Sequence, residues 1–116
     1  MGQPVAMFEI TARDTERATR FYSELFGWTA QPAGGGYALI DTQSGEAGIP
    51  GGIGHPEDGG GPRTTIYVRV DDLQACLDKA TELGGTALVP PTELPDGFGS
   101  FAVFADTEGT PIGLWA

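Results

Sequence analysis

The sequence predicts an α+β fold of two tandem βαβββ units, which form cupped mixed sheets with the helices on the outer face. One observation behind this prediction is an internal repeat, because similar helix starts occur at Asp14 and Asp72, 58 residues apart in a chain of 116. The other is the order of the segments. In each half one strand-like segment precedes the helix and three follow it, which is an α+β pattern. The length fits one domain, residues 1–116.

Both helices are delimited by capping residues and marked by an apolar stripe. An aspartate whose carboxylate can accept backbone N–H bonds opens each helix, and Gly27 or Gly84 follows where a left-handed C-cap is needed. Apolar residues recur at the i, i+3, i+4 and i+7 spacing of an amphipathic helix. They are Ala18, Phe21, Tyr22 and Leu25 in the first helix, and Leu73, Cys76, Leu77, Ala80 and Leu83 in the second.

The strands are predicted where β-branched and aromatic residues lie between Gly, Ser and Pro turns. In the first unit, residues 4–54, they are Val5–Thr11, Trp28–Gln31, Gly36–Asp41 and Ala47–Ile53. In the second unit, residues 64–116, they are Thr64–Val70, Thr86–Val89, Gly99–Ala105 and Ile112–Trp115. Residues 55–63, rich in Gly, Pro and acid, are interpreted as a solvated linker. The backbone path of residues 90–97 does not follow from the sequence.

The charge and composition limit the partners. With 16 acidic and 6 basic side chains, the net charge of −10 repels nucleic acid and anionic lipid. It tolerates a cationic molecule or a basic protein patch, although we favour a simple solubility role.

No apolar run approaches the roughly 20 residues of a membrane span, and residues 1–6 do not resemble a secretory signal. A lone Cys76 forms no internal disulfide and is interpreted as a small buried residue. A cytoplasmic protein is the expectation.

Several motifs, taken in order, resemble one protein family over nearly the whole chain. They are Phe8-Glu9-Ile10, Asp14, Phe21-Tyr22, Leu25-Phe26-Gly27-Trp28, Val68-Arg69-Val70-Asp71-Asp72, Leu83-Gly84-Gly85 and Asp106-Thr107-Glu108-Gly109. The set is similar to the vicinal oxygen chelate superfamily, which includes glyoxalase I, extradiol dioxygenases, and bleomycin and fosfomycin resistance proteins. The resemblance implies a glyoxalase-like fold, a homodimer, and a divalent metal held on His, Gln or Glu that chelates two neighbouring substrate oxygens.

The positions that the resemblance assigns to metal ligands carry unsuitable residues. The first ligand of each unit falls on Met7 and Thr65, and the last falls on Gly113, which has no side chain. The matching strand around Gly51 and Gly52 offers no carboxylate, and Glu46 is expected in the turn before it. A catalytic metal needs about three converging protein ligands. We therefore expect no metal and no other cofactor.

The sole histidine, His55, lies in the acidic linker and is interpreted as a bystander, with a weak site formed with Glu57 or Asp58 as the disfavoured alternative.

The inner faces of the strands supply the candidate binding site. Residues two apart on a strand share a face, so each position assigned to a ligand has neighbours on its own side. The predicted ligand-binding residues are Met7, Glu9, Thr65, Tyr67, Arg69, Gly113 and Trp115. An aromatic, sulfur-lined pocket with one acid suits an apolar ligand with a polar or cationic group. The competing interpretation, weighed equally, is that these side chains are ordinary core.

Glu9 is the candidate catalytic residue. A carboxylate on an apolar face can act as a general base or hold a cation. The structural alternative, slightly favoured, is an internal ion pair with Arg69.

Three functions follow from the sequence. The leading hypothesis is a metal-free protein that binds a hydrophobic or cationic organic molecule. The second is a lyase, isomerase or dioxygenase-like enzyme that uses Glu9 as base or a metal site not recognised in the sequence. The third is an interaction protein whose cupped sheets serve only to dimerise.

Overall fold

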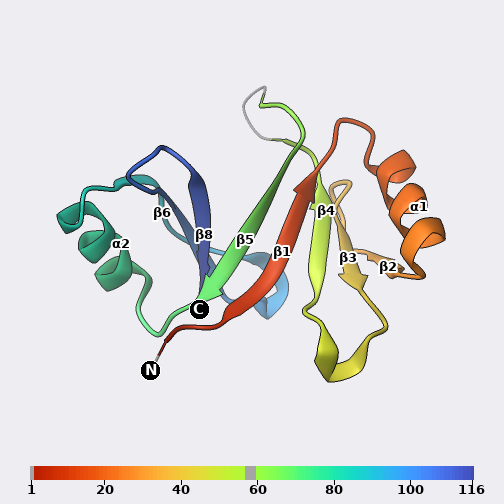
Figure 1. Ribbon diagram of the computed structural model, residues 1–116, viewed down its shortest axis with the longest axis horizontal. Coiled ribbons are helices and arrows are strands. Elements are labelled where there is room, and N and C mark those ends of the chain that lie inside the picture. The colour runs from red at the N-terminus through yellow and green to blue at the C-terminus, as the bar shows by residue number, and fades with distance from the viewer. Residues whose placement is uncertain (1, 57–59) are drawn as a thin grey trace. The chain divides into compact units, whose positions relative to one another are not determined.

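The computed structural model describes residues 2–56 and 60–116 of the chain (Figure 1). Contacts divide these residues into two compact units, and each is described by itself. The N-terminal unit is Met7–Thr65, and the C-terminal unit combines residues 2–6 with Ile66–Ala116.

The described residues hold eight strands and two α-helices, as the sequence predicts. In the first half of the chain these are β1 (Val5–Thr11), α1 (Thr15–Phe26), β2 (Thr29–Pro32), β3 (Ala38–Asp41), the 3-10 turn η1 (Gly45–Ala47) and β4 (Gly51–Gly54). In the second half they are β5 (Arg63–Arg69), α2 (Leu73–Glu82), β6 (Thr86–Glu93), the 3-10 turn η2 (Pro95–Gly97), β7 (Ser100–Ala105) and β8 (Pro111–Trp115).

Both units have the same mixed topology, which confirms the repeat. In the N-terminal unit the strand order is β2-β3-β4-β1, with two antiparallel pairs and a parallel β4–β1 pair. In the C-terminal unit the order is β6-β7-β8-β5, again with two antiparallel pairs and a parallel β8–β5 pair. Helix α1 contacts β2 and β4, and α2 contacts β6 and β7 (Figure 1).

Both aspartate N-caps and the C-cap Gly27 are confirmed, whereas the C-cap of α2 is Leu83, with φ of −86°, and the left-handed Gly84 comes one residue later. The side chain of Asp14 accepts a 3.0 Å hydrogen bond from the backbone N–H of Arg17, and Asp72 accepts one of 3.0 Å from Ala75. Helix α1 ends at Gly27, whose φ of 74° is left-handed. These side-chain acceptors satisfy backbone donors that an α-helix leaves unpaired at its start.

Each unit has its own core. In the C-terminal unit the buried cluster is Val70, Leu73, Leu77, Ala102 and Leu114. In the N-terminal unit Ile40 and Ile53 are almost fully buried, and Trp28 is the centre of an aromatic cluster. Its ring centroid lies 5.3 Å from that of Phe8, 5.8 Å from Tyr22 and 5.1 Å from Phe26.

The expected apolar stripe of α1 is only partly covered. Ala18 and Tyr22 are half-buried, whereas Phe21 and Leu25 are 58% and 59% exposed. In α2, Leu73 and Leu77 are buried, but Leu83 at the end of the helix is 67% exposed. Helical periodicity identifies an apolar stripe but not how much of it the sheet covers. In α1 the part of the stripe formed by Phe21 and Leu25 stays exposed.

Two predicted strands have different bounds in the structure. The strand predicted at Ala47–Ile53 begins only at Gly51, because Gly45–Ala47 forms η1. The strand predicted to end at Val89 continues to Glu93 through Pro90 and Pro91. Proline is tolerated there because β6 lies at the edge of its unit's sheet, and its pairing with β7 shifts register between Ala87 and Val89 and again between Val89 and Thr92. The remaining strands agree with the prediction within two residues.

No helix in the described part of the chain is both long enough and apolar enough to cross a membrane.

Candidate functional site

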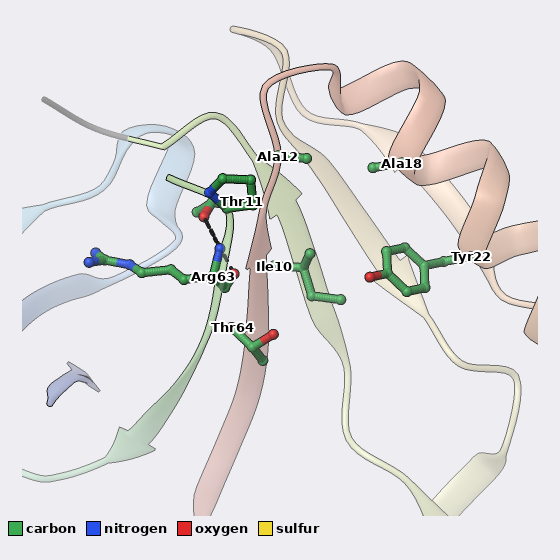
Figure 2. Close-up of a pocket in the computed structure, with 8 residues that line it drawn as sticks. Ile10, Thr11, Ala12, Ala18, Tyr22, Arg63 and Thr64 are labelled. Atoms are coloured by element: carbon green, nitrogen blue, oxygen red, sulfur yellow. Dashed lines mark hydrogen bonds between the residues drawn. The ribbon is translucent and has the colours of Figure 1, made fainter. Parts of the chain in front are cut away.

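Strand β1 sends alternate side chains to opposite faces of the N-terminal unit. Ile10 points toward α1, where it lines a pocket together with Tyr22 (Figure 2). Because side chains alternate along a strand, Met7 and Glu9 lie on the other face, away from the helix. Both are half-buried. We call this side of the N-terminal unit its inner face.

Tyr37 covers the glycines of β4 and binds Glu9 on this inner face. Its hydroxyl donates a 2.9 Å hydrogen bond to the Oε2 atom of Glu9. Its side chain lies over Gly52 and Gly54, where any Cβ would collide with the hydroxyl or the ring. Glu9 and Gly52 are register partners in the parallel β1–β4 pair. The missing side chain at Gly52 therefore allows the tyrosine to lie close to the backbone and reach the carboxylate.

The C-terminal unit repeats this arrangement of an aromatic ring over a glycine. Tyr67 and Gly113 are register partners in the parallel β5–β8 pair, and a Cβ at Gly113 would collide with the Tyr67 ring. Next along the same pair, the Arg69 guanidinium lies 4.7 Å from the centre of the Trp115 ring. The indole Nε1 of Trp115 donates a 2.8 Å hydrogen bond to the carbonyl oxygen of Phe98, which fixes the orientation of the indole. A cation already stacks on this ring.

The predicted site residues fall into two groups. Three are in the N-terminal unit and four in the C-terminal unit: Met7, Glu9 and Thr65, then Tyr67, Arg69, Gly113 and Trp115. In the C-terminal group, register places Tyr67 beside Gly113 and Arg69 beside Trp115. A cavity lined by both groups, and an ion pair between Glu9 and Arg69, remain predictions because each joins residues of different units.

Sequence reasoning missed Tyr37, the hydrogen-bond partner of Glu9. A signal was present in the segment Gly51-Gly52-Ile53-Gly54, where Gly52 and Gly54 share one face of a strand. Glycine inside a strand often marks a place where another group approaches the backbone closely. The signal locates the contact but does not identify the residue that makes it.

Two pockets lie on the helix side of the units. One, of about 290 Å³, lies between α1 and the strands, and Figure 2 shows Ile10, Ala18 and Tyr22 around it. At its upper edge the hydroxyl of Thr11 accepts a 3.0 Å hydrogen bond from the backbone N–H of Arg63. The other, of about 300 Å³, lies beside α2 and has Cys76 in its apolar lining. Neither pocket is lined by Met7, Glu9, Tyr67 or Trp115.

Burial raises the pKa of the Cys76 thiol. We expect iodoacetamide to modify Cys76 more slowly than it modifies glutathione at pH 8, and at the same rate in denaturant. Since the folded-state pKa is raised, the stability linked to this thiol is present below its ordinary pKa and is lost as the pH rises through the raised value. Alkylation rates of native protein and glutathione, followed by mass spectrometry from pH 7 to 10, check the expected slow modification of Cys76. A rate in native protein that equals that of glutathione contradicts it.

The topology of the two units defines a class of small α+β proteins with an internal βαβββ repeat. The sequence pattern of the glyoxalase/bleomycin resistance protein/dioxygenase superfamily matches residues 5–114. A glyoxylase-like domain-containing protein of Didymella fabae is 36% identical over 90% of this chain and 87% of its own length. The chain belongs to this superfamily.

Other relatives are longer than this chain. The mycobacterial protein CFP32 of Mycobacterium bovis, provisionally named a glyoxylase, is 34% identical over 92% of this chain but only 43% of its own length. The anthracycline biosynthesis protein DnrV of Streptomyces peucetius is 29% identical over 98% of this chain and 46% of its own length. The chain therefore spans less than half of these two proteins.

Solved structures share the fold at low sequence identity. Methylmalonyl-CoA epimerase of Mycobacterium tuberculosis has a TM-score of 0.67 and 18% identity, over 96% of this chain and 85% of that one. A variant of 4-hydroxymandelate synthase from Streptomyces coelicolor has a TM-score of 0.69 and 20% identity, over 97% of this chain and 38% of that one.

The residues at the positions that the resemblance assigns to metal ligands do not fit a divalent cation. Met7 offers a thioether, Thr65 a hydroxyl, and Gly113 no side chain, with the Tyr67 ring lying over it. Divalent ions in such sites take imidazole and carboxylate ligands. Within residues 2–56 and 60–116, no three His, Cys, Asp or Glu side chains lie close enough together to hold a metal ion.

Of the alternative weak metal site, the structure describes His55 alone. His55 is exposed, and its ring lies against Gly36. Glu57 and Asp58, its suggested co-ligands, lie outside the described residues.

Proposed function

We propose that this chain is a binding protein of the bleomycin resistance type that holds a small, mostly apolar organic molecule, aromatic or cationic, without a metal ion. The observation that carries the proposal is the contact between Glu9 and Tyr37 over Gly52. A carboxylate and a phenol ring stand there together on the inner face. The negative charge and the ring face both attract an organic cation, and the ring also stacks on a flat apolar molecule.

The C-terminal unit supports the same ligand chemistry. The Arg69 guanidinium over Trp115 occupies a position that an organic cation would take on an indole. Tyr67 adds a second ring, packed against the strand at Gly113. Aromatic side chains with few charged groups are typical of sites that hold drug-sized molecules by shape and weak polar contacts.

The names of the Streptomyces relatives suggest a matched pair of probes. They are named for anthracycline biosynthesis, and anthracyclines are flat aromatic molecules with a protonated amino sugar. The corresponding aglycone keeps the rings and lacks the amine. The pair therefore separates the contribution of aromatic stacking from that of the positive charge.

We expect Glu9→Gln to weaken binding of the cationic anthracycline about 10-fold and to leave binding of the aglycone nearly unchanged, because the substitution removes one charge and keeps the side-chain shape. Isothermal titration calorimetry of both probes against both proteins measures this. Glu46→Gln is the matched control, since it removes one exposed carboxylate from the 3-10 turn η1 and not from a strand. It should leave both dissociation constants unchanged.

Two results would reject the proposal. One is the absence of binding to any member of a wider panel of aromatic and cationic metabolites. The other is a stoichiometric metal in the purified protein by elemental analysis.

The Glu9 carboxylate, oriented by its hydrogen bond from Tyr37, also suits a second candidate function, in which Glu9 is the general base of a lyase or isomerase. Such an enzyme would catalyse exchange of a carbon-bound proton next to a carbonyl group of its ligand. Proton NMR in D2O measures this exchange for every panel member that binds. Loss of exchange in Glu9→Gln with retained binding would support the enzyme, and no exchange in the unaltered protein would reject it.

We also propose that the chain works in the cytoplasm as a homodimer. The excess of acidic side chains and the lone Cys76 agree with that location. Light scattering on a size-exclusion column tests the homodimer.

A further inference from the structure

Helix α1 presents an apolar surface that nothing in its unit covers. Phe21 and Leu25 are 58% and 59% exposed and lie one turn apart. Arg17 and Glu24 are also exposed and, at i−4 and i+3 from Phe21, flank the same face. We call Arg17, Phe21, Glu24 and Leu25 the outer face of α1. Large exposed apolar patches rimmed by charge are typical of protein interaction sites.

The charge of this helix distinguishes it from the rest of the chain. Residues 13–26 carry three arginines and three acidic residues and are neutral overall, although the chain has a net charge of −10. Leu83, the exposed apolar residue just after α2, lies in residues 71–84, which carry four acidic residues and one lysine. Two copies of this acidic chain repel each other least where the local charge is zero.

The order of charges along α1 is self-complementary. A homodimer with a two-fold axis places residue i of one copy opposite residue j of the other, and the reverse. If two α1 helices cross antiparallel at Phe21, Arg17 of each copy faces the Glu24 end of the other. Within residues 2–56 and 60–116, neither Arg17 nor Glu24 forms an ion pair with a side chain of its own copy.

We propose that the outer face of α1 is the contact surface between two copies of this chain. The inference rests on the homodimer proposed above and adds the surface that forms it. Phe21 and Leu25 form the apolar centre, and two Arg17–Glu24 pairs form the rim. The neutral charge of α1 in an otherwise acidic chain and the self-complementary order of Arg17 and Glu24 support a second copy as the occupant.

Sedimentation velocity over about 1–500 µM protein tests the surface. We expect a concentration-dependent dimer, and a dissociation constant at least about 10-fold higher for Phe21→Glu, because the substitution buries a charge at the apolar centre. Arg17→Glu alone and Glu24→Arg alone should weaken the dimer, since each homodimer then brings like charges together. Mixing these two variants should restore dimers, because each charge pair of the heterodimer again joins one acidic and one basic side chain.

Lys79→Glu is the matched control. It makes the same basic-to-acidic change at an exposed residue of α2 and leaves the charges of α1 as they are, so it should leave the dimer unchanged. Circular dichroism of each variant verifies that the helix is retained. A wild-type dimer that Phe21→Glu does not weaken, or variants that do not recover on mixing, would overturn the α1 surface and leave the homodimer. A wild-type protein that is monomeric at every concentration would overturn both the α1 surface and the homodimer. The proposal of ligand binding is unaffected by either result, because calorimetry tests it separately.

Discussion

Replacing Leu114 by alanine is expected to lower the free energy of unfolding by about 2–5 kcal/mol. Leu114 lies on β8 and is 2% exposed, among Val70, Leu73, Leu77 and Ala102. Truncation removes its contacts with α2 and the neighbouring strands and leaves a cavity that a small core cannot fill by relaxation. Because a domain of this size is stable by only about 5–15 kcal/mol, the loss is a large part of the total.

Urea unfolding followed by tryptophan fluorescence measures this loss. Leu88→Ala is the matched control, because it makes the same chemical change on β6 at a side chain that is 51% exposed. It should cost less than about 1 kcal/mol. Equal losses in the two variants would show that Leu114 does not hold the core of the C-terminal unit.

The fold could be predicted because the same helix-capping and strand signals occur in each half of the chain. Asp14 and Asp72 bond the backbone of the first helical turn in the structure, as their side chains indicated. Helix ends and strand order follow from such short-range signals. The exposure of Phe21 and Leu25 did not follow, because it depends on how far the sheet extends beneath α1. The extension of β6 through Pro90 also depends on its edge position, which only the sheet reveals.

The site could be predicted in part, and the limit has a physical cause. Strand alternation places Met7 and Glu9 on one face of β1, which the sequence shows directly. The partner of Glu9 depends on the turn before β3, where Gly34, Gly35 and Gly36 all have positive φ and set the direction in which the chain enters Tyr37. Consecutive glycines admit many backbone conformations, so their sequence does not specify where Tyr37 points.

Gly52→Ala is expected to destabilise the protein by about 1–3 kcal/mol, although alanine suits an extended strand better than glycine does. The added Cβ would collide with the Tyr37 hydroxyl, so the tyrosine must leave the inner face and give up its hydrogen bond to Glu9. The cationic anthracycline should bind at least about 10-fold more weakly to this variant, because the ring and the carboxylate are no longer held together.

A double-mutant cycle with Tyr37→Ala identifies the collision as the cause. When Tyr37 is already truncated, the Cβ at position 52 meets no ring, so Gly52→Ala should cost nothing there or stabilise by a few tenths of a kcal/mol. The coupling energy between the two sites is then close to the full cost of Gly52→Ala alone. Urea unfolding of the four proteins gives this energy. Costs that simply add would mean that Tyr37 does not lie over Gly52, and the contact that positions Glu9 would have to be sought elsewhere.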